Sequence, residues 1–451
     1  MPAPGHPTVS VVVASHDRPG WLARCLTSLG QLDYPAFEIV VVADAPSIAA
    51  LDPHPLRGAI KAIPVEGGNI SATRNAGIAE AGGDWLAFID DDAVAEPTWL
   101  SHHMQAAGAL GVQALVGFVR GRNGISYQSA VASVDAEGET HAEHAGDGVA
   151  FIPKLRRGRA LKLVGTNCVV RRDVLVALGG FDPAYRFFMD DTDLSLRLSR
   201  AGHVAGAAPL AQVHHAFAPS GRRTRLRAPL DLTEIGRSTA IFAHRYRGAP
   251  PDEIKERLLD RERARLIAHM VRGTCEPRDI APRMATLEQG WRMGAILDAP
   301  LPAPLDDPRR PFRRVDRMTV GHEVIPARLL GRRAAVGQAA RIVAEGGRAS
   351  VFSFLLTSNR HRVRFLRPGI WVQTGGQFGR SLRSGPAFRW CRFADRVREE
   401  MGRVALLRGI GETAVSLDAT QKDVRGKTAY QRSRGQDRNT GRKGSRDEYH
   451  A

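Results

Sequence analysis

Runs of apolar residues alternate with helically spaced segments along the first part of the chain. Residues 8–14 and 38–43 are nearly continuous β-branched runs, which are typical of parallel strands buried on both faces. Between them, residues 21–29 carry tryptophan, leucine and cysteine at helical spacing. A strand, a helix and a second strand in this order form a βαβ unit with a right-handed crossover. An α/β fold with a mostly parallel central sheet, flanked by helices, is therefore predicted here.

The same alternation continues further along the chain. A third strand is predicted over residues 60–65, a helix over 72–81 and a strand over 85–89. Ser71 stands directly before that helix, and we expect it to be the N-cap. A later strand is expected over residues 165–172, and a helix is expected to begin at Asp190.

Three consecutive acids, Asp90, Asp91 and Asp92, follow the strand over residues 85–89. One strand cannot bury three adjacent carboxylates, so we expect them at its carboxyl end, where open α/β sheets bind ligands. Like charges this close raise one another's pKa unless a cation lies among them. A hard divalent ion, Mg²⁺ or Mn²⁺, would relieve the repulsion. An acidic turn on the surface is the alternative.

A second acidic group opens the helix expected at residue 190, with Asp190, Asp191 and Asp193 in its first turn. The helix dipole favours acids there, so helix capping is one explanation. Three acids exceed what capping needs, and a carboxylate that faces a cleft can act as a general base. His214 follows a short apolar segment and is a candidate metal ligand.

Four arginines stand close together after this histidine. They form a basic loop that could close over a pyrophosphate, or else a solvated charge run: Arg222, Arg223, Arg225 and Arg227.

Length, composition and charge indicate the number of domains, the kind of partner and the cellular compartment. The chain has 451 residues, is 43 % hydrophobic and carries a net charge of +17, so two or three domains and an anionic partner are expected. Its 4 cysteines form no close pair, which indicates buried thiols in a reducing compartment. We expect no secretory signal at the start of the chain, and the longest apolar stretch, residues 106–119, is too short to span a bilayer. A cytoplasmic protein is predicted, with peripheral contact at the inner membrane face left open.

The second half of the chain predicts further units. Residues 252–300 are helical and amphipathic, which favours packing on the preceding domain over a membrane-surface role. After a proline-rich linker, a helix near residues 327–345 and later strands predict a small accessory unit. Trp371, Arg380 and Arg383 are its candidates for exposed acceptor or partner contacts. From about residue 416 the chain is polar, and disorder is predicted. The predicted domain limits are 8–248, 249–300, 301–410 and 411–451.

Seven segments, in order, resemble the family 2 glycosyltransferases, which have the GT-A fold. The resemblance covers roughly residues 8–245. Asp44 and Ser47 match an Asp-x-x-Ser pattern, and Asp90–Asp92 match the DxD motif. The remaining segments are residues 9–19, 69–77, 165–172, 179–182 and 190–202.

The resemblance implies a metal-assisted, inverting transfer of a sugar from a nucleotide-diphosphate sugar to an acceptor hydroxyl. It implies Mg²⁺ or Mn²⁺ as cofactor, with Asp92 as metal ligand and His214 near the metal. Asp191 takes the position of the catalytic base, with Asp190 beside it. Contacts to the nucleotide sugar are implied for Ser15, Asp44, Arg74, Asn75, Asp90 and Asp91.

Two departures from the family pattern concern specificity. Ala45 and Pro46 stand where a second acid or an amide is usual, which leaves the preference for a base open. Asp190 replaces the more common glutamate, which shortens the reach of that side chain.

The expected partners are a nucleotide-sugar donor and an acceptor that is a glycan, a lipid-linked sugar or a small molecule. Glycan or glycolipid synthesis would fit these partners. Contact with an anionic membrane stays open, and nucleic acid is not favoured. The alternative function is a catalytically weak GT-A-like domain that binds an anionic polymer or membrane. A nucleotidyltransferase is a third reading, but it would not need the motif at residues 190–194.

Overall fold

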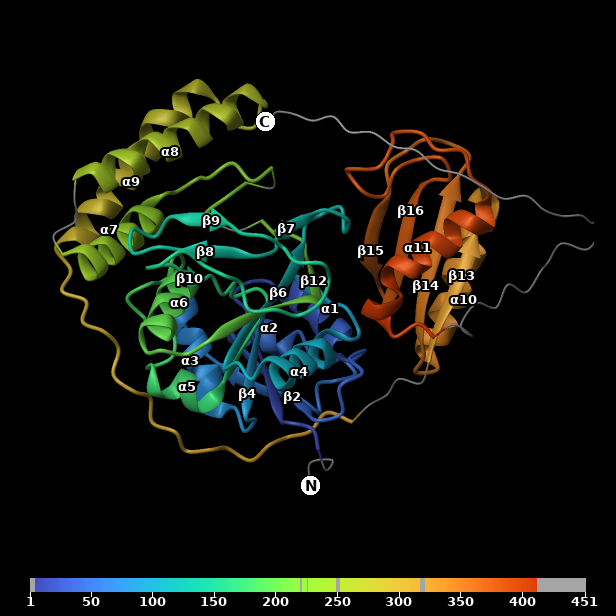
Figure 1. The fold of residues 1–451 in the computed structure, drawn as a ribbon, viewed down its shortest axis with the longest axis horizontal. Coiled ribbons are helices and arrows are strands. Elements are labelled where there is room, and N and C mark those ends of the chain that lie inside the picture. The colour runs from blue at the N-terminus through green and yellow to red at the C-terminus, as the bar shows by residue number, and fades with distance from the viewer. Residues whose placement is uncertain (1–4, 220, 225, 249–251, 317–320, 412–451) are drawn as a thin grey trace, which may run out of the picture. The chain divides into compact units, whose positions relative to one another are not determined.

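The computed structural model describes residues 5–219, 221–224, 226–248, 252–316 and 321–411, and all of these belong to one compact unit. At its centre is a nine-stranded sheet with the order β3-β2-β1-β4-β11-β6-β12-β5, to which β7 is added beside β6 (Figure 1). The strands are β1 (Val9–Ala14), β2 (Phe37–Ala43), β3 (Lys61–Pro64), β4 (Trp85–Asp90), β5 (Ala93–Ala95), β6 (Ala114–Arg120), β7 (Tyr127–Ser129), β11 (Cys168–Arg171) and β12 (Ala205–His215).

The first four strands of this order run parallel, as the apolar runs predict. Antiparallel β11 separates them from β6 and β12, which are parallel to each other, and β5 pairs antiparallel with β12. The predicted α/β fold with a mostly parallel central sheet is confirmed.

Helices cover both faces of the sheet, which explains why its central strands β1, β2 and β4 are mostly apolar. Val11 and Val13 of β1 pack in one core with α1 (Pro19–Leu29) and α4 (Trp99–Leu110). Val12 faces the other core, which includes residues of α3 (Ile70–Glu80), α5 (Arg172–Ala177) and α6 (Asp190–Arg200). Side chains alternate along a strand, so neighbours in one run belong to different cores.

The predicted N-cap of α3 is wrong by two residues. Asn69 is the N-cap, and its side-chain oxygen accepts a hydrogen bond from the Ala72 backbone N–H at 3.2 Å. The Ser71 hydroxyl instead donates to the Tyr185 carbonyl oxygen at 2.6 Å. Ser71 therefore ties the start of α3 to the segment that leads into α6.

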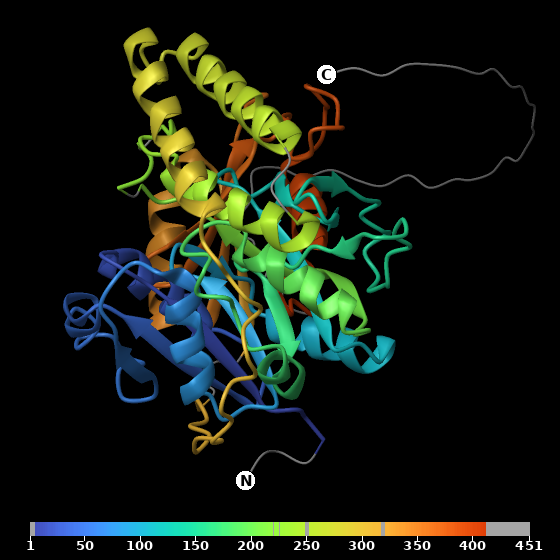
Figure 2. The same ribbon diagram turned by 90° about the vertical axis from the view of Figure 1, so that its left-hand side faces the viewer.

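A small antiparallel sheet follows β7 in the chain and consists of β8 (Ala132–Val134), β9 (Thr140–Ala142) and β10 (Ala160–Leu161). Beyond the large sheet come α7 (Thr233–Arg247), α8 (Asp252–Val271) and α9 (Pro277–Ala295), and α8 and α9 lie side by side in Figure 1 and Figure 2. Arg257 and Arg261 of α8 pair with Glu137 and Glu139 beside the small sheet. The helical region expected over residues 252–300 is present. Apolar residues of α8 pack with those of α7 and α9.

The predicted accessory unit is a four-stranded sheet, β13-β14-β16-β15, with helices α10 and α11. Its elements are β13 (His322–Ala327), α10 (Arg332–Ala344), β14 (Arg348–Leu355), β15 (Arg362–Leu366), β16 (Ile370–Gly376) and α11 (Phe393–Arg408). Trp371 was expected to be exposed, and this prediction is wrong. Its side chain is fully buried and packs with Val94 of β5 and with Val363 and Phe365 of β15. Arg383 is exposed, as expected.

The domain limits at residues 248, 300 and 410 stay predictions, since the described residues form one compact unit. The tail predicted from residue 411 lies, apart from that residue, outside the described residues. Among the described helices, none combines the length and apolar character needed to cross a bilayer.

Candidate active site

The carboxyl ends of β1 and β4 open onto a cavity of about 480 Å³. These two strands are adjacent and parallel, and Ala14 lies opposite Asp90, so the residues that follow them start at the same level. The polar residues of the lining come from several separate segments: Ser15, His16, Asp17, Arg18, Thr73, Arg74, Asp90, Asp91, Asp92, Thr166, Asp190, Asp191, His215, Arg222 and Arg223. The structure thus brings the first predicted acidic group and, of the second, Asp190 and Asp191 to one cavity, whereas Asp193 is buried elsewhere.

Asp90, Asp92 and His215 could hold a metal ion and are called the metal triad, because each residue offers one ligand atom within 4.8 Å of the others. His215 Nε2 lies 2.9 Å from an Asp92 carboxylate oxygen and 3.9 Å from an Asp90 oxygen. Burial alone would raise the pKa of Asp92, but His215 and the Ala218 backbone N–H lower it to about 2. Asp92 is therefore an ionised carboxylate at neutral pH, as a metal ligand must be.

The prediction of His214 as the residue near the metal is wrong by one position. Its ring makes a hydrogen bond of 2.8 Å to Glu96 and lies beside Trp371, on the side away from the cavity. Successive side chains of a strand point to opposite faces, so only one of two neighbouring histidines of β12 can face the carboxylates. That histidine is His215.

Asp91 is also buried and has hydrogen-bond partners of its own. Its carboxylate accepts hydrogen bonds from the Ser15 hydroxyl at 2.7 Å and from Arg18 at 3.1 Å. Burial raises its pKa to about 7, although Arg18 opposes this and Asp92 adds to it. Ser15 thus lines the cavity and also holds Asp91 in position.

Arg74 joins the two acidic groups. Its guanidinium donates to Asp190 and, at 3.2 Å, to Asp90. Burial raises the pKa of Asp190 despite the charge of Arg74. Asp190 is therefore committed to a buried pair with Arg74.

Asp191 is the half-buried acid of α6 that lines the cavity. One of its oxygens accepts a hydrogen bond from the Gly165 backbone N–H at 3.2 Å. Arg74 forms its ion pairs with Asp90 and Asp190, so these pairs leave the carboxylate of Asp191 facing the cavity.

Two predicted nucleotide contacts do not line the cavity. Asp44 caps α2 (Ala45–Ala49) through the Ser47 backbone N–H at 2.9 Å and also accepts the Asp17 N–H at 2.8 Å. Burial opposes the effect, but these hydrogen bonds lower the pKa of Asp44. The Asn75 amide nitrogen donates to the Phe181 carbonyl oxygen at 2.6 Å, and its amide oxygen accepts from the Phe181 backbone N–H at 2.9 Å. The nucleotide contact of Asp44 stays a prediction, whereas Asn75 has a structural role.

Among the lining residues that were not predicted from the sequence are His215, Thr166 and Phe187. The Thr166 hydroxyl donates to Asp90, and the Arg222 guanidinium lies 4.2 Å from the centre of the Phe187 ring. Thr166 belongs to a segment of the family resemblance, which was the available signal. Of the basic loop, Arg222 and Arg223 line the cavity, Arg227 lies over Phe217, and Arg225 is outside the described residues.

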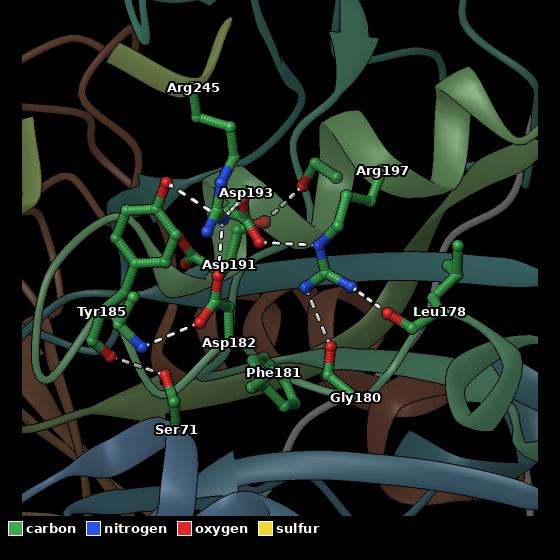
Figure 3. A network of polar contacts seen from close by, with 12 residues as sticks. Ser71, Leu178, Gly180, Phe181, Asp182, Tyr185, Asp191, Asp193, Arg197 and Arg245 are labelled. Carbon is green, nitrogen blue, oxygen red and sulfur yellow. Dashed lines mark hydrogen bonds and ion pairs between the residues drawn. The ribbon is translucent and has the colours of Figure 1, made fainter. Parts of the chain in front are cut away.

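A buried network of hydrogen bonds and ion pairs beside Asp191 holds the start of α6 in place (Figure 3). Asp193, fully buried, accepts hydrogen bonds from Arg197 at 2.7 Å and from Arg245 at 2.8 Å. Arg245 belongs to α7 and also pairs with Asp182 at 2.5 Å. The network therefore connects the helix that carries Asp191 to the helix behind it.

We expect Asp193→Ala to lower the free energy of unfolding by about 3 kcal/mol, because two buried arginines lose their shared partner. Urea unfolding followed by circular dichroism measures this change. Asp173→Asn is the control, since Asp173 also lies in the first turn of a helix but pairs with Arg171 at the surface. Equal stability of both variants would contradict the assigned role of Asp193.

The fold and the acidic cavity place this chain among α/β proteins that bind ligands at the carboxyl ends of parallel strands. Residues 10–179 match the family model described as Glycosyl transferase family 2. This part of the chain is therefore similar to the family 2 glycosyltransferases, in agreement with the resemblance seen in the sequence.

Several named proteins are similar to parts of this chain. The O-antigen biosynthesis protein RfbC of Myxococcus xanthus is 29% identical over 48% of this chain and 18% of its own length. The succinoglycan biosynthesis protein ExoM of Rhizobium meliloti is 28% identical over 46% of this chain and 66% of its own length. The crystal structure of GalNAc-T7 with UDP, GalNAc and Mn²⁺ is similar over 49% of this chain and 45% of that chain, with 18% identity and a TM-score of 0.39. The chain spans less than a third of the length of the first curated relatives that it matches.

Proposed function

We propose that this protein transfers a sugar from a nucleotide-diphosphate sugar to an acceptor hydroxyl, with inversion at the anomeric carbon. The observation that carries the proposal is the convergence of Asp90, Asp91, Asp92 and Asp191 on one cavity. Acids at a surface turn or a helix cap have no reason to share a cavity. The match of residues 10–179 to the family model supports sugar transfer as the reaction class.

The donor set of the metal triad fits a divalent cation. Two carboxylate oxygens and one imidazole nitrogen lie close enough to share an ion, and such ligands suit Mg²⁺ or Mn²⁺. Asp90, Asp92 and His215 would hold the ion, which would supply positive charge to the leaving nucleoside diphosphate. Arg222 and Arg223 line the same cavity and offer further positive charge for a diphosphate.

Asp191 is the proposed general base. In the proposed step the acceptor oxygen forms a bond to the anomeric carbon while the bond to the diphosphate oxygen breaks. The acceptor proton passes to Asp191, and the nucleoside diphosphate leaves with the bonding electrons. Attack opposite to the leaving group inverts the anomeric carbon. Arg74 contributes indirectly, because it neutralises Asp190 and Asp90 and so limits the negative charge around Asp191.

The acceptor is proposed to be a glycan, a lipid-linked sugar or a small molecule. The relatives named for O-antigen and succinoglycan biosynthesis favour a role in the synthesis of a polysaccharide or another glycan. Contact with an anionic membrane is compatible with the net charge of +17 but rests on that charge alone.

A thermal-shift panel of UDP, GDP, dTDP and CDP, each with and without Mn²⁺, tests the proposal. A ligand that binds only the folded protein raises its melting temperature by mass action. We expect one nucleotide to raise the Tm by several degrees only when Mn²⁺ is present. No shift with any nucleotide, together with salt-sensitive binding to polyanions, would instead favour the binding-module alternative.

A further inference from the structure

A buried charged network lies directly behind the metal triad, on the side away from the cavity. Glu96 follows β5, the strand that begins one residue after Asp92. Its carboxylate accepts hydrogen bonds from His214 at 2.8 Å and from the Arg408 Nε at 3.0 Å. The side chains of Glu96 and Arg408 are both only 1 % exposed. Arg408 is in the last turn of α11, so this pair joins the glycosyltransferase domain to the accessory unit.

The accessory unit holds Arg408 in a fixed orientation. A second guanidinium nitrogen donates to the Ser350 hydroxyl at 2.9 Å, and the guanidinium carbon lies 4.5 Å from the centre of the Trp371 ring. The Trp371 ring also lies 5.0 Å from that of His214. Arg408 therefore reaches Glu96 with its planar fork already oriented, which a lysine could not reproduce.

Glu96 in turn fixes the pairing of β5 with β12. Its backbone N–H donates to the Gln212 carbonyl oxygen at 3.1 Å, and its carboxylate holds His214. In this register, His215 lies opposite Ala93, the residue after Asp92. The distance between Asp92 and His215 thus depends on the same pairing that Glu96 secures.

The strand β5 needs such support. It has three residues and is the edge strand of the large sheet, with β12 as its neighbour. The outward side of β5 is covered by the accessory unit, since Val94 packs with Val363, Phe365 and Trp371. The Thr98 hydroxyl adds a hydrogen bond of 2.8 Å to the Leu407 carbonyl oxygen.

We propose that Arg408 is a positioning residue for the metal triad, and that the accessory unit braces β5 so that Asp92 and His215 stay at ligating distance. The inference deepens the proposed function and rests on it in one respect, that the triad holds a divalent cation. It assigns a role to the region after residue 320 that the sequence left without one.

Titration of the full chain with Mn²⁺, followed by electron paramagnetic resonance in the absence of nucleotide, tests this role. Arg408→Lys keeps the charge but loses the planar fork, and we expect it to raise the Kd for Mn²⁺ about tenfold, as is usual when the support of a metal ligand is removed. Glu96→Gln is expected to act in the same direction, and it provides a second variant if one of the two folds poorly.

Val397→Ala is the matched control. Val397 lies on the same helix α11 and is buried against Phe352 and Phe354, away from Glu96. We expect it to lower the Tm while leaving the Kd for Mn²⁺ within about twofold of the wild type, since the cost is a core cavity.

The outcomes separate this inference from the proposed function. Wild-type affinity for Mn²⁺ in Arg408→Lys and Glu96→Gln, or an equal loss in Val397→Ala, overturns the positioning role and leaves the proposed function standing. Absence of Mn²⁺ binding in the wild type contradicts metal assistance and the inference together.

Discussion

Replacing Asp191 by asparagine is expected to reduce kcat for sugar transfer by about 10³-fold, while binding of the nucleotide stays close to that of the wild type. General bases contribute about 10²–10⁴-fold to enzymatic rates, and the amide has nearly the shape of the carboxylate but cannot take the acceptor proton. Release of the nucleoside diphosphate from the matching donor and an acceptor measures kcat. The Mn²⁺-dependent thermal shift measures binding in the same variant.

The control must reproduce the loss of an acid from the first turn of a helix. Asp173→Asn does so at α5, where Asp173 lies outside the cavity. We expect its kcat to stay within about twofold of the wild type, as for surface substitutions in general. If Asp191→Asn transfers sugar as fast as the Asp173→Asn control, Asp191 is not the base, and Asp190 is too tightly paired with Arg74 to replace it.

The central sheet was predictable from the sequence because strands that are buried on both faces consist mainly of apolar residues. Residues 8–14 and 38–43 are apolar except for Thr8, Ser10 and Glu38, and such nearly continuous runs are typical of strands covered by helices on both faces. The helix α11 was not predicted. Its buried residues include Arg396, Glu400 and Arg408, whose charges pair only in the folded protein. A pattern of apolar and polar positions cannot distinguish a buried charged residue from an exposed one.

The same limitation explains the errors at the site. Neighbouring His214 and His215 have equal chemistry, and which of them faces Asp92 depends on the register of β12 against β5. That register depends on residues far apart in the sequence, including Arg408 of the accessory unit, which pairs with Glu96. Trp371 was expected at the surface, yet it packs between His214 and Arg408. Each error concerns a residue whose environment is built by distant parts of the chain.

Replacing Asp92 by alanine is expected to abolish the Mn²⁺ dependence of nucleotide binding and to lower kcat/KM by at least about 100-fold. Removing this carboxylate takes away a ligand of the metal triad and leaves His215 without the partner at 2.9 Å. Charge stabilisation by a bound metal amounts to several kcal/mol in the transition state, which corresponds to rate losses of this size. Electron paramagnetic resonance of Mn²⁺ and donor turnover measure the two effects separately.

A second group of side chains competes for the role of metal site, and one variant distinguishes the two. His16, Asp17 and Asp44 also offer ligand atoms within 4.8 Å of one another. The carboxylate of Asp44 is already occupied, because the backbone N–H groups of Asp17 and Ser47 and the Ser47 hydroxyl all donate to it. We therefore expect Asp17→Ala to bind Mn²⁺ as the wild type does, and Asp92→Ala to lose it. The reverse result would move the metal to the end of β2, and with it the diphosphate, so that Asp191 could no longer be assumed to lie next to the bond that breaks.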